Sequence, residues 1–463
     1  MSELINKTPP TVMKFGGTSV KDAEAFSRVA KIVRAQTEFL PIVVTSAMSG
    51  MTDALLDAFE TAKDGSFDEA ILGLDEQFER HKAVSNSLLS GAQVSKFCKE
   101  LALAKEDLSS LLMRVERRSL PLQILKDAIV SFGEQLSSML LNEVFRANEM
   151  NSRHIDARRL IVTDDEYGAA KPFWEETEEF VNLELAEIIA KREIPVMGGF
   201  IAANRSGETT TLGRGGSDYS AALVGAALKA REIQIWTDVT GVLTCDPRIC
   251  ADARTVNVLS YNEAAELAYF GAKVLHPKTI QPAVDYGIPV RVCNSHAPDE
   301  RGTMVLANSE SSENSIKSIA HKTGITILRI TSARMLGSYG FMSALFQVFE
   351  RYRTVIDVIS TSEVSVALTL DNTESIEKIV SELQRLGEVE VESGFAVICI
   401  VGNGLRESSG FASKIFSTIA NTNIALISHG ASDVNLTFVV EASSVENVIS
   451  ALHKEFFQPV EAR

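Results

Sequence analysis

Two glycine-rich loops in the sequence combine cations, hydroxyls and flexible backbone in a way that suits the binding of phosphate or carboxylate groups. They are KFGGTS (14–19) and TTTLGRGGSD (209–218). Backbone N–H groups in a glycine turn that leads into a helix form a cradle for anions. Lys14 adds a mobile charge, and the guanidinium fork of Arg214 suits a carboxylate or a phosphate. Two such cradles, each with a cation, suit a phosphoryl group that passes between two bound anions.

The first loop alone is a weak signal. It is not a GxxxxGK[ST] phosphate loop, and GxGxxG is also absent from the sequence. A Gly-Gly turn is an ordinary connection between a strand and a helix, so a purely structural role remains open for it. The second loop favours the functional interpretation of both.

Other polar residues follow apolar segments, where α/β sheets bind ligands. SAMSGMT (46–52) offers hydroxyls, and WTDVTGVLTCDPR (236–248) is rich in polar turn residues. Glu134 stands beside a glycine that opens a helix, and Lys273 lies in FGAKVLHP. Taken alone, a glutamate on a helix is more often a solvated acid, and a single lysine is more often a surface residue.

The elements that must position these loops alternate between strand and helix. Thr11–Phe15 is a short apolar run, residues 20–35 carry helical spacing, and residues 41–52 begin as a β-branched run, which predicts a parallel βαβ unit. Residues 52–150 are almost wholly helical in pattern and predict a helical subdomain. The alternation then resumes with HIDARRLIVT, REIPVMGGFIAA, a helix after Gly216, EIQIWTDVTGVLT, the helical YNEAAELAYFGAKVL and IPVRVCN. We expect one α/β domain over 1–305, with a mainly parallel sheet sandwiched by helices.

The remainder of the chain contains a repeat. Residues 306–316 read as a linker, and Gly340-Phe341 then matches Gly410-Phe411 at an offset of 70 residues. Each copy reads helix, strand, strand, helix, which predicts two ferredoxin-like α+β modules at 317–393 and 394–463. From the pattern alone, the two modules could serve only to hold subunits together.

Composition narrows the class of protein. The chain has 463 residues, and 45 basic against 61 acidic side chains give a net charge of −16. This balance argues against nucleic-acid binding. No apolar run is long enough for a membrane helix, and we find no secretory signal. Five scattered cysteines predict neither disulfides nor a Cys/His metal motif. We expect a cytoplasmic enzyme.

Four of these segments in order resemble the motifs of the aspartate kinases, in the amino-acid-kinase family. They are VMKFGGTSV, TTLGRGGSD, WTDVTGVLTCDPR and FGAKVLHP, and the paired modules look like that family's ACT domains. The segment SEVSVALTL is most similar to the lysine-sensitive, monofunctional type. The resemblance implies transfer of phosphate from ATP, with Mg²⁺, to the side-chain carboxylate of L-aspartate. It also implies feedback inhibition by L-lysine and a homodimer, or a tetramer, formed through the ACT modules.

The resemblance assigns roles to individual residues. Lys14 and Asp218 would be catalytic, with Asp218 organising the lysine and the substrate. Arg214 would bind the α-carboxylate of aspartate and Glu134 its ammonium. The remaining aspartate-binding residues would be Ser46, Thr52, Ser217 and Asp218, and the phosphate and ATP-binding residues would be Lys14, Gly16, Gly17, Thr237, Asp238, Arg248, Lys273 and Val274. No metal ligand is assigned.

The chemistry of such a reaction agrees with the residues present. A β-carboxylate has a pKa of about 3.9 and is already ionised at neutral pH, so the nucleophile needs no general base. The sequence shows no Ser/His/Asp arrangement. What the reaction requires is neutralisation of charge between two anions together with in-line positioning.

In the first module, Asp357 and Glu363 are expected to flank a turn between two strands, and two carboxylates near apolar side chains suit a ligand with two ammonium groups, as lysine has. With the resemblance, the expected lysine site comprises Met335, Ser338, Phe341, Met342, Asp357, Thr361, Ser362 and Glu363. From local sequence, Asp357 could equally cap a turn. Threonine as effector, another amino-acid kinase, a catalytically silent amino-acid sensor and a scaffold are the alternatives that remain open.

Overall fold

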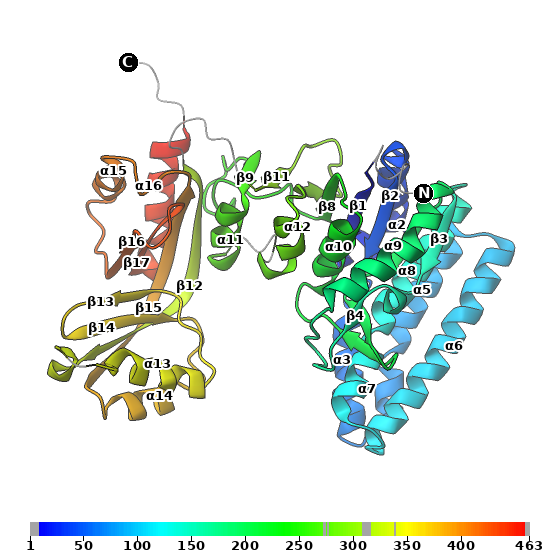
Figure 1. Ribbon diagram of the computed structural model, residues 1–463, viewed down its shortest axis with the longest axis horizontal. Helices are drawn as coiled ribbons and strands as arrows, with labels where there is room; N and C mark the ends of the chain where they lie inside the picture. The colour runs from blue at the N-terminus through cyan, green and yellow to red at the C-terminus, as the bar shows by residue number, and fades with distance from the viewer. Residues whose placement is uncertain (1–8, 272–274, 276, 308–315, 338, 459–463) are drawn as a thin grey trace. The chain divides into compact units, whose positions relative to one another are not determined.

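The structure is a computed structural model that describes residues 9–271, 275, 277–307, 316–337 and 339–458 (Figure 1). By its internal contacts the chain divides into two units. Unit 1 comprises 1–241 and 274–308, and unit 2 comprises 242–273 and 309–463. This division differs from the expected boundary at residue 305, because residues 242–273 pack with the C-terminal modules. Among the described residues, no helix is both long and apolar enough to span a membrane.

A mainly parallel sheet forms the centre of unit 1, as the sequence predicts. β1 (Thr11–Phe15), whose Val12, Met13 and Phe15 are buried, lies between β2 (Pro41–Thr45) and β8 (Glu232–Thr237), and it is parallel to both. The chain passes from β1 to β2 on one side and from β8 to β10 (Val290–Asn294) on the opposite side, and such a divergence opens a crevice at the carboxyl ends of the strands. The strand order is β3 (Ser152–Ile155), β5 (Ile194–Gly198), β2, β1, β8, β10 and the antiparallel β11 (Thr303–Leu306).

The predicted helical subdomain is present. Leucine, alanine and glutamate, which favour helices, dominate this part of the chain. Phe97, Leu108 and Phe145 are completely buried in its core. The helices are α3 (Met51–Lys63), α4 (Phe67–Leu72), α5 (Asp75–Leu88), α6 (Gly91–Glu116), α7 (Leu122–Val130) and α8 (Phe132–Ala147). The other helices of unit 1 are α2 (Ala23–Arg34), α9 (Trp174–Ala190), α10 (Gly216–Ala227) and α12 (Gln281–Asp285).

Two segments expected as single strands are each divided between two sheets. Residues 192–203 form β5 and then β6 (Ile201–Asn204), and residues 154–163 contribute to β3 and to β4 (Val162–Thr163). The break after β5 falls at Gly198-Gly199-Phe200, where Phe200 has a φ of 65°. β6 pairs with β4 and with β7 (Thr209–Thr211) in a separate three-stranded sheet. The apolar pattern alone did not indicate this turn.

In unit 2 the two repeated modules share one six-stranded antiparallel sheet. Its order is β13 (Ile359–Thr361), β14 (Ser365–Leu370), β12 (Ile316–Thr331), β15 (Glu388–Gly402), β17 (Asn435–Glu441) and β16 (Leu426–His429). The repeat is visible in the helix starts, because Gly340 and Gly410 begin α13 (Phe341–Arg351) and α15 (Phe411–Thr418) with φ angles of 84° and 81°. The remaining elements are β9 (Val258–Ser260), α11 (Tyr261–Tyr269), α14 (Ile376–Leu383) and α16 (Val445–Phe457).

The long strands β12 and β15 run through both modules. Gly324 and Gly394, with φ angles of 76° and 91°, allow the two strands to bend where their register shifts. As a result, Ile319, at the beginning of β12, packs in the core of the second module, whereas Leu328 packs in the core of the first. The beginning of β12, which the sequence assigns to the first module, therefore packs with the second module.

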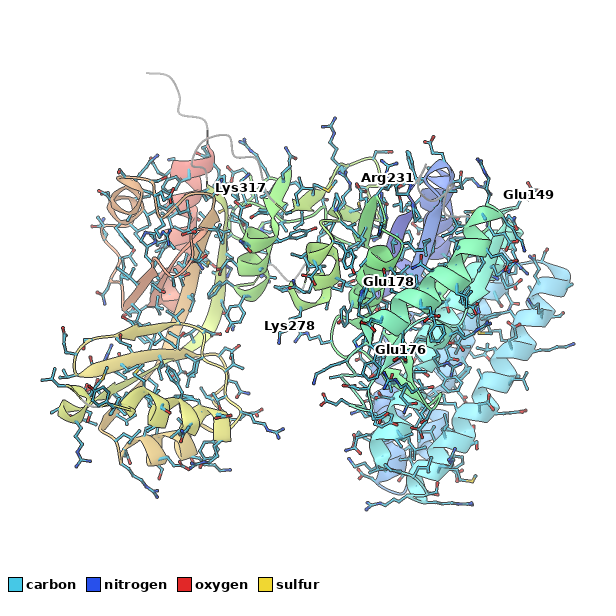
Figure 2. The ribbon with its side chains drawn as sticks, viewed as in Figure 1. Glu149, Glu176, Glu178, Arg231, Lys278 and Lys317 are labelled. Carbon is cyan, nitrogen blue, oxygen red and sulfur yellow. The ribbon has the colours of Figure 1, made fainter. Side chains whose placement is uncertain are left out.

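Charged side chains cover the outer faces of unit 1 (Figure 2). Glu176 and Glu178 lie on α9, and Glu176 pairs with Arg205. The guanidinium of Arg231, after α10, lies 4.2 Å from the ring centre of Phe39.

Candidate active site

A pocket of about 380 Å³ opens at the carboxyl ends of β1, β2 and β5, entirely within unit 1. It brings together the two glycine loops, the hydroxyl loop after β2 and the start of α8, which are far apart in the sequence. Of the residues expected from the sequence, Lys14, Gly17, Ser46, Thr52, Glu134, Arg214, Ser217 and Asp218 line this pocket. Two side chains that the sequence did not suggest, Asp53 and Phe200, also line it.

Lys14 and Asp218 form the central charge pair of the pocket. The Nζ atom of Lys14, on β1, lies 2.7 Å from Oδ1 of Asp218, in the first turn of α10. The two side chains are only 12% and 14% exposed. Salt and water screen such a pair less than a surface pair. Asp218 thus fixes the ammonium of Lys14 at the wall of the pocket.

The first glycine loop is held tightly against its neighbours. The N–H of Gly16 donates to the carbonyl of Trp236 at 3.1 Å, and a Cβ on Gly17 would lie 3.0 Å from the carbonyl oxygen of Ala47. The expected helix does not begin here: residues 17–20 form a 3₁₀ turn, and α2 begins at Ala23, capped by Asp22. Any anion cradle at this loop is therefore made by a turn and not by the end of α2.

The second loop leads into the N-terminus of a helix, α10, as the sequence predicts. Gly213 and Gly215 have φ angles of 74° and 73°, so both adopt the left-handed conformation that glycine tolerates best. Arg214 between them is exposed. α10 begins at Gly216, and its first turn carries the buried Ser217. The amide groups and the positive dipole end of α10 thus face the same pocket as Arg214.

Close contacts between backbones shape the rest of the pocket. A Cβ on Gly199 would lie 2.7 Å from the Cα of Ser217, so glycine is needed for β5 to approach α10. Gly50, with a φ of 83°, begins α3 and places Thr52 in its first turn. The hydroxyl of Ser137, on α8, donates to the carbonyl of Ser46 at 2.6 Å. These contacts hold the hydroxyl loop beside α8.

Glu134 is a buried acid and not a solvated one. It is 4% exposed, and its Oε2 atom has no hydrogen-bond partner among the described residues. Burial raises the pKa of Glu134 to about 8, although a hydrogen bond from the backbone of Ala47 and the charge of Lys14 act in the opposite direction. An unpartnered carboxylate oxygen in a pocket wall is suited to receive a cation from a ligand.

The raised pKa of Glu134 predicts how the stability of the free protein depends on pH. The folded chain holds this proton up to about pH 8, whereas the unfolded chain loses it near 4.5. The contribution of protonated Glu134 to the free energy of unfolding is therefore fully present below pH 4.5 and is lost as the pH rises through 8. Between pH 6 and pH 8 we expect unfolding free energy to fall by about 2 kcal/mol more in the unmodified chain than in Glu134→Gln. Urea unfolding of both proteins measures this difference, and equal pH dependence would contradict it.

The residues expected at a nucleotide are divided between the units. In unit 1, Thr237 ends β8 and Asp238 follows it, and the hydroxyl of Thr237 donates to Oδ1 of Asp238 at 3.1 Å. In unit 2, Arg248 is 86% exposed and forms a fork with the carboxylate of Asp246. Gly16 lies in the first loop, beside the pocket. Lys273 and Val274 lie outside the described residues.

The residues expected at an effector site gather in the first module of unit 2. Met335, Phe341 and Met342 surround the start of α13 and pack against its core. Thr361, the last residue of β13, is exposed, as are Ser362 and Glu363 after it, and Ser338 lies outside the described residues. Asp357 precedes β13. Asp357 and Glu363 thus stand at opposite ends of a strand, which corrects the expectation that they flank a turn between strands.

Asp357 already has two partners. Its side chain is 1% exposed, lies 3.1 Å from Nζ of Lys322, and accepts a hydrogen bond of 2.6 Å from the hydroxyl of Tyr269. Lys322 also pairs with Asp371 at 2.6 Å. Burial lowers the pKa of Lys322, but its hydrogen bonds to Asp371 and Asp357 outweigh this and raise it. Neither Lys322 nor Tyr269 was found from the sequence, because a lysine in a strand and a tyrosine at a helix end carry no distinctive pattern.

The chain matches two families. Residues 9–294 match the amino acid kinase family, and residues 398–456 match an ACT domain. Among curated proteins it is similar to the lysine-sensitive aspartokinase 3 of Escherichia coli, with 36% identity over 99% of this chain and 100% of that protein. It is also similar to the chloroplastic aspartokinase 3 of Arabidopsis thaliana, with 38% identity over 98% of this chain and 83% of that protein.

Solved structures give the same result. Aspartokinase III of E. coli in complex with lysine and aspartate, described as the T-state, has a TM-score of 0.84 at 36% identity and covers 97% of this chain and 100% of its own. The same enzyme with aspartate and ADP, described as the R-state, has a TM-score of 0.81 with the same coverage. The aspartate kinase of Clostridium acetobutylicum has a TM-score of 0.83 at 26% identity, over 96% of this chain and 100% of its own.

Proposed function

The chain belongs to the amino acid kinase family as an aspartokinase, and from this premise we propose how its residues convert ATP and L-aspartate to ADP and 4-phospho-L-aspartate. One observation carries the proposal: a single pocket holds the Lys14–Asp218 pair, the exposed Arg214 and the unpartnered oxygen of Glu134. The charge of Lys14 is opposite to that of the phosphoryl group, and the charge of Arg214 is opposite to that of the α-carboxylate. The buried acid matches the ammonium group of aspartate.

The proposed roles follow from these groups. Arg214 binds the α-carboxylate, Glu134 binds the ammonium, and Ser46, Thr52 and Ser217 donate hydroxyls, which leaves the ionised β-carboxylate directed at ATP. A β-carboxylate oxygen forms a bond to the γ-phosphorus, the bond from this phosphorus to the bridging oxygen breaks, and ADP leaves with the electron pair. Lys14 and the amide groups at Gly16 and Gly17 neutralise charge on the transferring group. Asp218 positions Lys14. No general base takes part.

At the nucleotide we propose Thr237, Asp238, Arg248, Lys273 and Val274. Mg²⁺ would neutralise the phosphates. Three carboxylates line the pocket and fit a divalent cation only in part: Asp218 pairs with Lys14, and Glu134, with its pKa of about 8, is largely protonated at neutral pH, which leaves the exposed Asp53. We therefore propose that Mg²⁺ is held mainly by ATP and water.

Outside the pocket we propose a catalytic domain at 1–305, a linker at 306–316 and ACT modules at 317–393 and 394–463. Ile359, Val364 and Ile427 are large apolar side chains, each 38–46% exposed, on or beside the edge strands β13 and β16. This supports a homodimer, or a tetramer, assembled through the ACT modules. The five cysteines are free, which supports a cytoplasmic location.

The enzyme is lysine-sensitive, and we propose that lysine binds at Met335, Ser338, Phe341, Met342, Asp357, Thr361, Ser362 and Glu363. The side chain of Asp357 is 1% exposed and is paired with Lys322. An effector ammonium therefore reaches this carboxylate only when Lys322 or Tyr269 moves away. The ammonium of Lys322 is a competitor of the same chemistry as the effector.

Two substitutions at this pair are expected to change lysine inhibition in opposite directions. Asp357→Asn removes the charge that the effector needs and should raise the half-inhibiting lysine concentration by at least about 30-fold. Lys322→Met removes the competitor and should lower this concentration by about tenfold. Activity without lysine should stay within about twofold in both. Lysine titrations of the purified variants measure this, and two unchanged curves would place the effector site elsewhere.

The proposed reaction is tested by ATP- and Mg²⁺-dependent formation of hydroxamate, which traps an acyl phosphate. L-aspartate should give hydroxamate, L-glutamate should not, and added L-lysine should lower the yield. Hydroxamate that is insensitive to lysine would retain the kinase and point to another effector, such as threonine. Folded protein that gives no hydroxamate would favour an amino-acid sensor of the same fold.

A further inference from the structure

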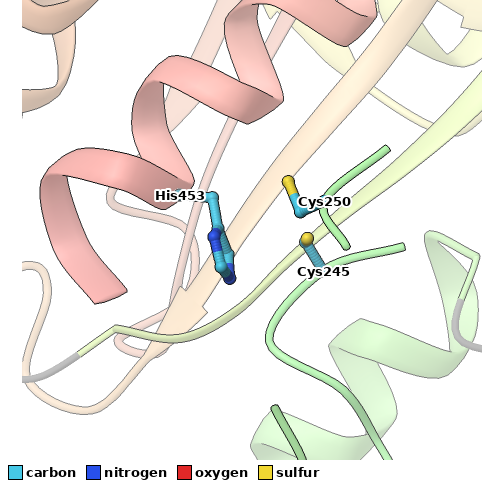
Figure 3. Close-up of side chains that lie close together, drawn as sticks. All are labelled: Cys245, Cys250 and His453. Carbon is cyan, nitrogen blue, oxygen red and sulfur yellow. The ribbon is translucent and has the colours of Figure 1, made fainter. Parts of the chain in front are cut away.

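Three side chains that commonly bind soft metal ions meet inside unit 2 (Figure 3). Cys245 and Cys250 lie on the loop before β9, and His453 lies on α16. The three are 3%, 6% and 2% exposed, and one ligand atom from each lies within 4.8 Å of the others. Cys250 and His453 are separated by about 200 positions in the sequence, so no local motif indicates the cluster.

The size of the cluster suits a tetrahedral ion. Zinc lies about 2.3 Å from sulfur and about 2.0–2.1 Å from nitrogen, so two of its ligand atoms are about 3.5–3.8 Å apart. The ligand atoms of the three side chains, all within 4.8 Å of one another, need to close by no more than about 1 Å.

The imidazole of His453 has the surroundings of a metal ligand. Its Nδ1 lies 3.5 Å from Oδ1 of the half-exposed Asp252, and its Nε2 lies 2.9 Å from the hydroxyl of the buried Thr244. A carboxylate at one ring nitrogen holds the ring and leaves the other nitrogen to a metal. The ring also stacks on Phe457 at 4.8 Å between centres. Binding through Nε2 requires this nitrogen to give up its hydrogen bond with the hydroxyl of Thr244.

The loop that carries the thiols is fixed by its backbone. The N–H of Ile319, on β12, donates to the carbonyl of Thr244 at 2.8 Å, and the N–H of Arg254 donates to the hydroxyl of Thr244 at 3.0 Å. Buried cysteines alone are ordinary apolar residues, and these two do contact the core that contains Leu452. Apolar packing does not account for a polar imidazole buried beside both sulfurs.

We propose that Cys245, Cys250 and His453 bind one thiophilic divalent cation of the zinc class. Both thiols bind as thiolates and release their protons to solvent. Water completes the tetrahedron, and Asp252 stays at Nδ1 of His453. The ion would join the loop 245–250 to α16, and this loop carries Arg248, one of the residues assigned above to the nucleotide. Metal binding itself does not depend on that assignment.

Cobalt provides a direct test, because a Co²⁺–thiolate bond gives a charge-transfer absorption band. The reduced, chelator-treated full chain is titrated with Co²⁺ under argon. We expect the band to saturate at one equivalent and Zn²⁺ to abolish it. The band should be absent in Cys245→Ser/Cys250→Ser, and His453→Gln should bind Co²⁺ at least tenfold more weakly. The matched control Cys399→Ser, a buried cysteine outside the cluster, should behave as the unmodified chain.

A second measurement needs no variant. Zn²⁺ should slow alkylation of Cys245 and Cys250 by iodoacetamide at least tenfold, as followed by peptide mass spectrometry, and leave the half-exposed Cys98 unaffected. A cobalt spectrum without thiolate charge transfer, or equal alkylation with and without Zn²⁺, overturns the site. A Cys245–Cys250 disulfide in the purified protein, with no metal uptake after reduction, also overturns it. None of these readouts depends on kinase activity.

Discussion

Replacing Lys14 with methionine is expected to lower kcat for phosphoryl transfer by about 10³-fold, with KM for ATP and aspartate changed only a few-fold. The ammonium is held at the pocket by Asp218 at 2.7 Å and is the cation closest to the first glycine loop. Charge on the transferring group is greatest in the transition state, so loss of this cation affects the chemical step more than binding. Steady-state kinetics at saturating substrates measure the effect.

The control must separate chemistry from folding, because Lys14→Met leaves a mostly buried Asp218 without its partner. Lys31→Met removes an exposed lysine from α2 and should leave kcat unchanged. In Lys14→Met/Asp218→Asn no unpaired charge is left, so stability should recover and activity should not. Recovery of activity in this double variant would remove Lys14 from the mechanism and leave it a structural role.

Replacing Arg214 with alanine is expected to raise KM for aspartate by about 10²-fold, with little change in KM for ATP. Two glycines with positive φ present the guanidinium at the pocket. In the complex it would form a paired, largely desolvated contact with the α-carboxylate, and truncation of such a pair costs about 2–5 kcal/mol. Arg214→Lys should recover only a small part of this loss, since an ammonium cannot form the two parallel hydrogen bonds of a guanidinium.

A modified substrate makes this prediction specific. L-Isoasparagine has an amide in place of the α-carboxylate but retains the β-carboxylate that reacts. In the unmodified enzyme, KM for L-isoasparagine should exceed KM for aspartate by about the factor by which Arg214→Ala raises KM for aspartate. In Arg214→Ala the two substrates should have similar KM values. Full discrimination in the variant would mean that another group binds the α-carboxylate.

The sequence predicted the parts of the fold that depend on local pattern. β1 falls at Thr11–Phe15 as expected, and the alternation of strands and helices is that of the parallel sheet. The 70-residue repeat predicted that a helix begins after a glycine in each module, and the structure has these glycines at Gly340 and Gly410. These features follow from hydrophobic periodicity and from glycine at positive φ, which are properties of neighbouring residues.

What the sequence did not predict depends on contacts between distant residues. Residues 192–203 are divided between two sheets because Gly199 approaches Ser217 closely. The beginning of β12 packs with the second module because the long strands bend at Gly324 and Gly394. The unpartnered oxygen of Glu134 appears only when the wall that buries it is assembled. Likewise, the sequence indicated Asp357 but not the ion pair that it forms with Lys322.

With lysine bound at Asp357 as proposed, the hydrogen bond from Tyr269 to Asp357 would link effector binding to the conformation at the end of α11. An effector ammonium that displaces Tyr269 frees the end of α11, which continues directly into the segment that carries Lys273. A nucleotide that favours the bonded arrangement of Tyr269 must then weaken lysine binding by the same factor by which lysine weakens nucleotide binding. Lysine would thus act as a weaker inhibitor when ATP is abundant, although the two ligands share no binding residue.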